Sequence, residues 1–175
     1  MIEPVTLSVN DSDVTLDVEP RESLGNVLHD RLGYGGVHVA CAQGVCGACT
    51  VAVDGEAIRS CLILAVQAAG RRIRTSAAVS ERGGLSRLQL LLKERGAVQC
   101  GYCTSGVVMS LWSLFEERPV PTVHEIQQAL SGHLCRCTGY AGMVEAALAY
   151  AEERRDGLDE NAGPCTGRGG TDQIS

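Results

Sequence analysis

Nine cysteines stand out among the 175 residues, and eight of them fall into two groups with short internal spacings. The tightest pair is Cys135 and Cys137, which one arginine separates in the stretch GHLCRCTGY. A disulfide between them would close a small, strained ring, because disulfide geometry needs well-separated Cα atoms. Clustered cysteines that are not paired in disulfides typically bind metal or carry out redox chemistry. The spacing therefore indicates a metal or redox site.

The first group has the spacing C-x4-C-x2-C and a fourth cysteine after eleven further residues. Its opening matches the loop of plant-type [2Fe–2S] ferredoxins. Gly44 and Gly47 would let the backbone wrap tightly and aim N–H groups at the sulfurs of an anionic cluster. A structural zinc site is the alternative, but zinc sites favour C-x2-C pairs and need no four-residue loop. The predicted ligands of this site are Cys41, Cys46, Cys49 and Cys61.

The second group joins a C-x2-C pair to the C-x-C pair, and its predicted ligands are Cys100, Cys103, Cys135 and Cys137. Each pair lies next to the start of a predicted helix, so the positive ends of two helix dipoles would favour a negatively charged cluster. Taken alone, this pattern also fits zinc. Beside a ferredoxin loop in the same chain, it indicates a second iron–sulfur cluster.

The remaining candidate residues predict no further chemistry. Cys165 lies in a polar, glycine-rich tail and is expected to be a free thiol without a role. No histidine is placed in a C-x-H step, so a Rieske centre is not expected. The chain has no G-x-G-x-x-G after a predicted strand and no P-loop, so it is not expected to bind flavin or nucleotide itself. Structural or surface roles are expected for His29, His38, His124 and His133.

Composition narrows the class of protein further. Hydrophobic residues make up 45% of the chain, which allows a real core, and the formal net charge of −6 argues against a nucleic-acid partner. The N-terminus lacks the pattern of a signal peptide, and the longest apolar run is too short to span a bilayer. We therefore expect a cytoplasmic location, where disulfides are rare.

Residues 1–76 are expected to form a small sheet packed on one helix. Alternating apolar residues predict two strands, at 5–9 and 14–18, with a polar four-residue loop between them. The stretch SLGNVLHDRL has helical spacing, and Ser23 is its predicted N-cap. Two further short strands flank the predicted two-residue turn at Asp54–Gly55.

The rest of the chain is expected to be helical. The small, polar segment 76–84 predicts a linker. Helices are predicted around residues 85–92, 107–115 and 143–148, and Thr122 with Glu125 forms a capping box that opens another. Four helices suggest a bundle. The polar, glycine-rich residues 155–175 are expected to form a flexible tail.

Together, the stretches CAQGVCGACTVAVDG…SCL, GAVQCGYCTSG and HLCRCTGY resemble the iron–sulfur subunit of the molybdenum hydroxylases, the family of xanthine dehydrogenase, aldehyde oxidase and carbon-monoxide dehydrogenase. The resemblance covers about residues 3–154. It implies an α+β fold: an N-terminal β-grasp domain of the plant-type ferredoxin kind at 1–76, and a four-helix-bundle [2Fe–2S] domain at 84–154.

The resemblance also implies a function. Electrons would pass from a molybdopterin centre through two [2Fe–2S] clusters towards FAD, with the helical-domain cluster nearer molybdenum. A large subunit would hold the molybdopterin and a medium subunit the FAD, and we expect a dimer of such heterotrimers. Gln99 matches the glutamine that approaches the pterin, and Cys137 matches the cysteine nearest to it. This chain would contain no catalytic residue and no substrate site.

The sequence departs from the family pattern at three places. Ser105 stands where proline is common, Ala42 replaces a frequently acidic residue, and the 76–84 linker lacks an acidic–glycine step. None of these changes a predicted ligand. The loops resemble those of bacterial enzymes acting on aromatic or N-heterocyclic compounds more than those of the animal enzymes.

Two other functions stay open at this point. One is a free-standing two-cluster electron carrier, although a carrier needs only the first domain. The other is a zinc-bound interaction module.

Overall fold

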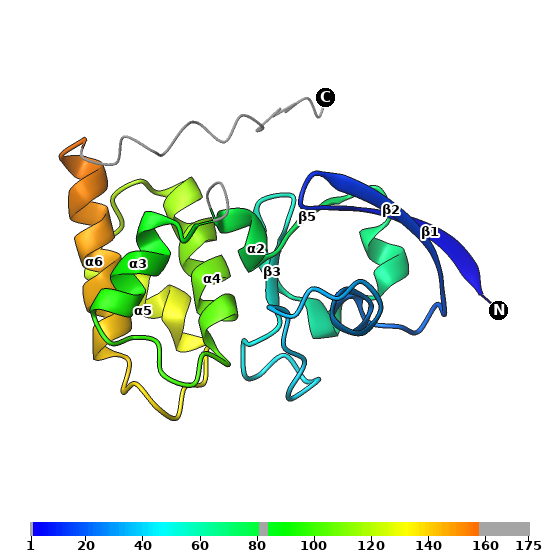
Figure 1. Ribbon diagram of the computed structural model, residues 1–175, viewed down its shortest axis with the longest axis horizontal. Helices are drawn as coiled ribbons and strands as arrows, with labels where there is room; N and C mark the ends of the chain where they lie inside the picture. The colour runs from blue at the N-terminus through cyan, green and yellow to red at the C-terminus, as the bar shows by residue number, and fades with distance from the viewer. Residues whose placement is uncertain (1, 81–83, 158–175) are drawn as a thin grey trace, which may run out of the picture.

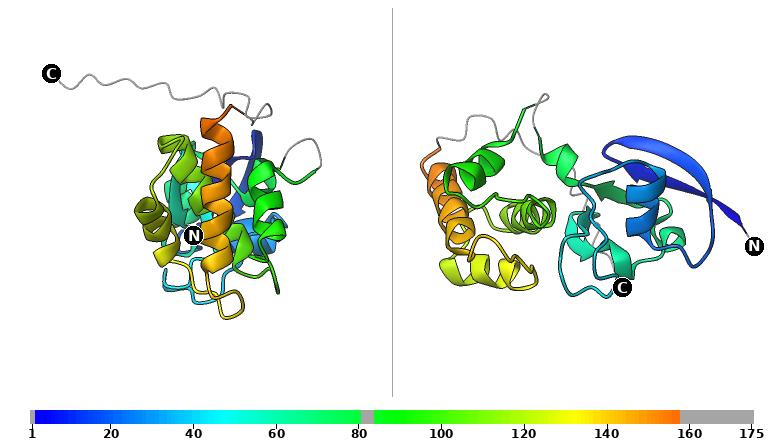
Figure 2. Two further views of the ribbon diagram at one scale, coloured as in Figure 1. Left: turned by 90° about the vertical axis from the view of Figure 1, so that its left-hand side faces the viewer. Right: turned by 60° about the horizontal axis from the view of Figure 1, so that its bottom comes forward.

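The computed structural model describes residues 2–80 and 84–157. It has a mixed α/β part, built around a five-stranded sheet, and a helical part beside it (Figure 1). The two parts lie side by side along the long axis of the molecule, as a second view also shows (Figure 2). Each part has its own hydrophobic core. Cys165 and residues 158–175 of the predicted tail lie outside the described residues.

The sheet brings together strands that are far apart in the sequence. Its order is β2-β1-β5-β3-β4; β1 runs parallel to β5, and the other neighbouring strands are antiparallel. The strands are β1 (Glu3–Val9), β2 (Ser12–Val18), β3 (Thr50–Val53), β4 (Glu56–Arg59) and β5 (Arg72–Arg74).

The first predicted hairpin is present, but its turn is shorter than expected. Only Asn10 and Asp11 form the turn, with φ angles of 51° and 63°, so Ser12 and Asp13 belong to β2. Asn and Asp tolerate this left-handed conformation, and such a two-residue turn matches the twist of the paired strands. The predicted Asp54–Gly55 turn between β3 and β4 is confirmed, with φ angles of 52° and 95°.

Strand β5 was not predicted from the sequence, because it is only three residues long and two of them are arginines. Its central Ile73 is buried in the core and pairs with both β1 and β3. The predicted first helix is present as α1 (Leu24–Asn26), which continues as one wider π-helical segment over Val27–Arg31. Ser23 caps α1 as predicted, since its Oγ accepts a hydrogen bond from Asn26 N at 3.2 Å.

Five helices occupy the second half of the described chain, namely α2 (Ser76–Val79), α3 (Arg87–Glu94), α4 (Thr104–Glu117), α5 (Val123–Ser131) and α6 (Ala141–Arg155). Helix α2 lies within the segment predicted to be a linker, so part of that segment is helical. The capping box of Thr122 and Glu125 at the start of α5 is confirmed. Helix α3 has a capping box of its own, formed by Ser86 and Gln89.

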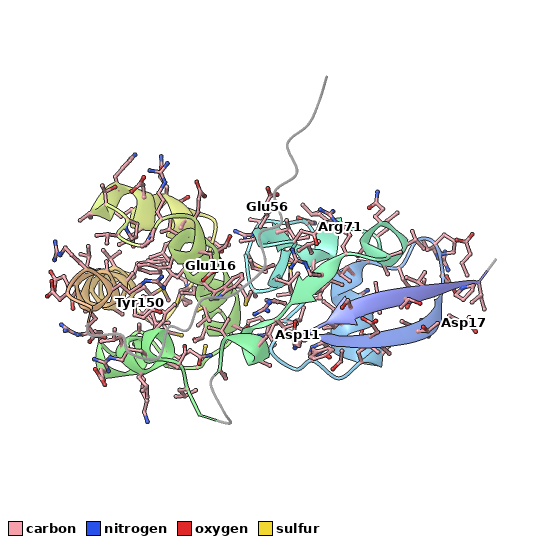
Figure 3. The ribbon with its side chains drawn as sticks, turned by 90° about the horizontal axis from the view of Figure 1, so that it is seen from above. Asp11, Asp17, Glu56, Arg71, Glu116 and Tyr150 are labelled. Atoms are coloured by element: carbon pink, nitrogen blue, oxygen red, sulfur yellow. The ribbon has the colours of Figure 1, made fainter. Side chains whose placement is uncertain are left out.

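The helical part has an aliphatic core with few aromatic residues. Helix α6 packs against α3 and α5, and α5 packs against α4. Phe115 is fully buried between these helices, and Tyr150, labelled in Figure 3, packs edge-on against it at a centroid distance of 4.8 Å. On its other side α4 packs against β3 and β4, so this helix joins the two parts of the molecule.

Candidate metal centres

The first predicted cysteine loop connects the first helical segment to β3 and wraps tightly. Gly44 and Gly47 have φ angles of 73° and 79°, as expected for a loop that needs glycine there. A Cβ atom added to Gly44 would collide with the side chain of Leu62, the residue after Cys61. The glycine therefore lets the loop close against the segment that carries the fourth cysteine.

Backbone amides in this loop point at a sulfur. Gln43 N and Cys46 N each donate to Cys41 Sγ at 3.4 Å. These hydrogen bonds lower the pKa of Cys41 to about 6, with a further contribution from the Cys46 side chain. Such N–H groups stabilise a thiolate and the negative charge of a cluster bound to it.

The remaining two cysteines of the first set also lie together. Burial, together with the neighbouring Cys49 side chain, raises the pKa of Cys61 to about 11. Cys46 is thus a neighbour of Cys41, and Cys49 a neighbour of Cys61; Cys41 also raises the pKa of Cys61, so the first set lies close together.

The second set has the same arrangement in pairs. Cys100 Sγ and Cys137 Sγ lie 3.7 Å apart. Two sulfurs on one tetrahedral metal with bonds of about 2.3 Å are separated by about 3.8 Å, so this pair has the spacing of two ligands to one metal ion. Burial, together with the adjacent Cys135, raises the pKa of Cys103 to about 12. Cys103 therefore pairs with Cys135.

The two pairs of the second set differ in exposure. Cys103 is buried as the N-cap of α4, which confirms its predicted place at a helix start. Cys100 and Cys137 are exposed, and so is Gln99 beside them. The second site thus has an inner pair of sulfurs and an outer pair that reaches the surface.

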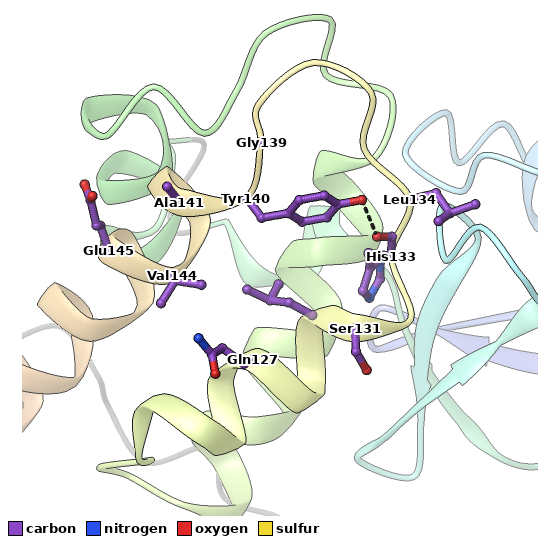
Figure 4. Close-up of a pocket in the computed structure, with 10 residues that line it drawn as sticks. Gln127, Ser131, His133, Leu134, Gly139, Tyr140, Ala141, Val144 and Glu145 are labelled. Carbon is purple, nitrogen blue, oxygen red and sulfur yellow. Dashed lines mark hydrogen bonds between the residues drawn. The ribbon is translucent and has the colours of Figure 1, made fainter.

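A tyrosine that the sequence reading missed holds the C-x-C loop. Tyr140 has a φ of 68° just before α6, and its Oη accepts a hydrogen bond from Cys135 N at 2.8 Å. The same hydroxyl donates to His133 O at 3.1 Å (Figure 4). Thr138 Oγ1 lies 3.2 Å from Cys135 Sγ. The aromatic residue directly after C-x-C-T-G was the signal available in the sequence.

At Cys135, hydrogen bonds lower the pKa of the thiol more than burial raises it. Burial by itself raises the pKa of this thiol, but hydrogen bonds from Thr138 and from backbone amides lower it overall. At the exposed pair the pKa of Cys137 is raised, because the Cys100 sulfur lies beside it.

The two cysteine loops meet at the boundary between the α/β part and the helical part. Leu134 N, one residue before Cys135, donates to Cys46 O at 3.0 Å. His38 Nδ1 lies 2.8 Å from Tyr102 O, and the two rings stack at a centroid distance of 4.4 Å. Since Tyr102 lies between Cys100 and Cys103, and Leu134 precedes Cys135, the first cysteine loop and the residues just before it contact both segments of the second set.

The donor set fits two [2Fe–2S] clusters. Each site offers four thiols in two pairs, as a cluster with two irons requires, and amide N–H groups already point at one of the sulfurs. Over residues 2–80 and 84–157, no three His, Cys, Asp or Glu side chains converge on a position for one metal ion. The eight described cysteines are free thiols.

Comparison with known families defines the class of protein. Residues 7–74 match the model of the 2Fe-2S iron-sulfur cluster binding domain, and residues 75–148 match that of the [2Fe-2S] binding domain. The chain therefore contains two [2Fe–2S]-binding domains.

Individual relatives define the family. The chain is 48% identical to the nicotine 6-hydroxylase small subunit of Paenarthrobacter nicotinovorans, over 82% of this chain and 87% of that subunit. It is 41% identical to the xanthine dehydrogenase iron-sulfur-binding subunit of Escherichia coli, over 82% of this chain and 91% of that one. A chain of quinoline 2-oxidoreductase from Pseudomonas putida 86 superposes with a TM-score of 0.84 at 39% identity, covering 89% of this chain and 98% of that one.

The chain belongs to the family of iron–sulfur subunits of the molybdenum hydroxylases. It is an electron-transfer subunit of an oxidoreductase complex. Within the described ranges 2–80 and 84–157, no helix is both long and apolar enough to cross a membrane.

Proposed function

We propose that Cys41, Cys46, Cys49 and Cys61 hold one [2Fe–2S] cluster and that Cys100, Cys103, Cys135 and Cys137 hold the other. The observation that carries this assignment is the 3.7 Å contact between Cys100 Sγ and Cys137 Sγ, beside the two backbone amides that donate to Cys41 Sγ in the first set. When bound, the clusters accept and release single electrons and relay them from the molybdopterin centre of the complex towards FAD.

The second site faces the large, molybdopterin-binding subunit in this proposal. Gln99 and Cys137 are both exposed, so they can approach a cofactor held by another chain. The inner pair, Cys103 and Cys135, lies on the side of the first loop, since Leu134 is hydrogen-bonded to Cys46. This contact supports an order in which electrons reach the second site first and the first site next.

The first site faces the medium, FAD-binding subunit. Two exposed apolar residues lie next to cysteines of the first set: Val45 precedes Cys46 and Leu62 follows Cys61, with 57% and 61% of their surface accessible. Exposed apolar residues beside a site favour docking of a partner over contact with water. We further propose that the complex is a dimer of heterotrimers.

The domain boundaries follow the two cores. We propose a β-grasp ferredoxin domain at 1–76, a four-helix-bundle domain at 84–154 and a tail at 155–175. The sheet order and the separate cores support the first two, and helices α3 to α6 would make up the proposed bundle. Using the cysteines as cluster ligands suits a reducing compartment, so we propose a cytoplasmic location.

The substrate of the complex is proposed to be an N-heterocyclic compound. Nicotine, xanthine and quinoline, which appear in the names of the relatives, all contain a nitrogen heterocycle. The large subunit would select among such compounds, because this chain has no proposed substrate site. Turnover assays of the purified complex with N-heterocycles and with simple aldehydes would test this choice; preference for the aldehydes would contradict it.

Metal analysis tests the cluster assignment. We expect about four irons and four acid-labile sulfides per chain, and two distinct S = 1/2 EPR signals after reduction. The signals should differ because one site is a glycine loop and the other lies at a helix start. Stoichiometric zinc without iron would contradict the assignment. Purification of the native chain alone, without two larger subunits, would instead favour a free-standing carrier.

A further inference from the structure

Three consecutive residues before Cys135 join the second cysteine loop to the α/β part. Gly132 O accepts a hydrogen bond from Arg59 Nη2 at 2.8 Å, and Leu134 N donates to Cys46 O at 3.0 Å. Between them His133 is buried, with 1% of its surface exposed. The segment 132–134 therefore lies directly between the two sets of cysteines.

Arg59, at the end of β4, links three points of this boundary. Its Nη1 donates to Thr50 Oγ1 at 2.6 Å, and Thr50 Oγ1 in turn donates to Gly47 O at 2.6 Å. Its Nη2 reaches across to Gly132 O. A Cβ atom added to Gly132 would collide with this guanidinium group, so the contact is close. One side chain thus connects the sheet, the first cysteine loop and the segment before the second.

His133 fills the space between the first loop and α4. Its Nε2 lies 2.7 Å from Ser110 Oγ on α4. A Cβ atom built on Gly47 would lie only 2.5 Å from His133 Nδ1, so the ring packs directly on the backbone between Cys46 and Cys49. The ring therefore sets how closely the first loop approaches both α4 and the C-x-C segment.

We propose that Arg59 and His133 are positioning residues that fix the separation and orientation of the two cluster sites for electron transfer between them. This inference rests on the proposed assignment of the clusters. Electron transfer falls steeply with distance, so a small shift of one loop slows it even when both clusters are intact. The hydrogen bond from Leu134 N to Cys46 O is a main-chain contact, whereas Arg59 and His133 hold it in place through their side chains.

The test uses the assembled complex carrying Arg59→Met or His133→Ala in this subunit. Each preparation is first shown to contain the wild-type amount of iron. Fully reduced samples are then examined by low-temperature EPR for the magnetic interaction between the two S = 1/2 clusters, and the rate of electron equilibration between them is measured after rapid partial reduction. We expect a smaller interaction and an equilibration slowed severalfold, with the g-values of each cluster retained.

Matched controls change the same residue types away from the boundary. Arg71→Met removes a surface ion pair with Asp54, and His124→Ala changes an exposed residue of α5. Both are expected to keep the wild-type interaction and rate. If Arg59→Met or His133→Ala loses iron, the same EPR and rate measurements are made on Arg59→Lys and Ser110→Ala. These changes weaken the hydrogen bonds of Arg59 and His133 but leave the volume of both side chains largely filled.

The outcomes separate this inference from the cluster assignment. Wild-type protein without two EPR signals would overturn the assignment itself. Wild-type protein with two interacting signals, together with iron-replete variants that keep the wild-type interaction and rate, would overturn the positioning role alone.

Discussion

At the scale of single residues, the protein stabilises the thiolate form of some cysteines and destabilises that of others. Backbone N–H groups lower the pKa of Cys41 to about 6, whereas burial raises that of Cys103 to about 12. Spacing along the sequence predicts two sets of four cysteines, and this assignment stays a prediction. Spacing gave no information on which sulfurs pair, because pairing depends on how the loops fold back. The contacts of Arg59 could not be predicted for the same reason.

Tyr140→Phe tests how far a residue that binds no metal supports the second site. The change removes a partly buried hydroxyl that accepts from Cys135 N and donates to His133 O. We expect the folded state to lose about 1–2 kcal/mol of stability, because a buried N–H is left unpaired. The EPR signal of the second cluster should shift or broaden, while that of the first stays unchanged.

The control for this variant is Tyr150→Phe, which changes a tyrosine of α6 that packs on Phe115. It should leave both EPR signals as in the wild type. An unaltered second signal in Tyr140→Phe would show that the hydroxyl does not shape the C-x-C loop.

At the scale of elements, the helices and strands with a strong periodic pattern were predicted correctly, whereas the shortest elements were not predicted. The two hairpins, the first helix and the α5 capping box were predicted because alternation, helical spacing and turn residues all agreed. Strand β5 and helix α2 are three and four residues long, too short for a period to be recognised. Tertiary packing determines such elements: β5 exists because Ile73 fits between β1 and β3.

Gly106→Ala tests the packing of α4 on the first cysteine loop. In an exposed helix this change usually stabilises by up to about 1 kcal/mol, because glycine is a poor helix former. Here a Cβ atom would collide with Gly47 O, so α4 and the loop must separate. We expect the opposite sign, a loss of about 1–3 kcal/mol in thermal or denaturant unfolding, with lower iron content.

Gly35→Ala is the matched control, because its φ angle is not positive and a Cβ atom there meets no other atom within 4 Å. It should leave stability and iron content close to wild type. Stabilisation by Gly106→Ala would mean that the helix and the loop are not in close contact.

At the scale of the whole molecule, the relation between the two parts was the least predictable feature. The sequence indicated a cysteine set in each half but not that the two sets meet. Their contact depends on side chains of α4, β3 and β4, such as Ser113, whose Oγ accepts from Ala57 N and donates to Gly55 O. These contacts join segments more than fifty positions apart, so a local sequence pattern cannot predict them.

The order of electron flow is a property of the assembled complex, and two cysteine variants test it. Cys49→Ser should damage only the first cluster and Cys103→Ser only the second, because separate segments build the two sites. If the second site is next to molybdenum, substrate should still reduce the second cluster in Cys49→Ser, while flavin reduction stalls. In Cys103→Ser, substrate should no longer reduce the first cluster at a normal rate. Rapid mixing with substrate, freezing and EPR measure both, after gel filtration has shown that each variant assembles. A Cys103→Ser complex that reduces the first cluster at the wild-type rate would show that electrons do not pass through the second site.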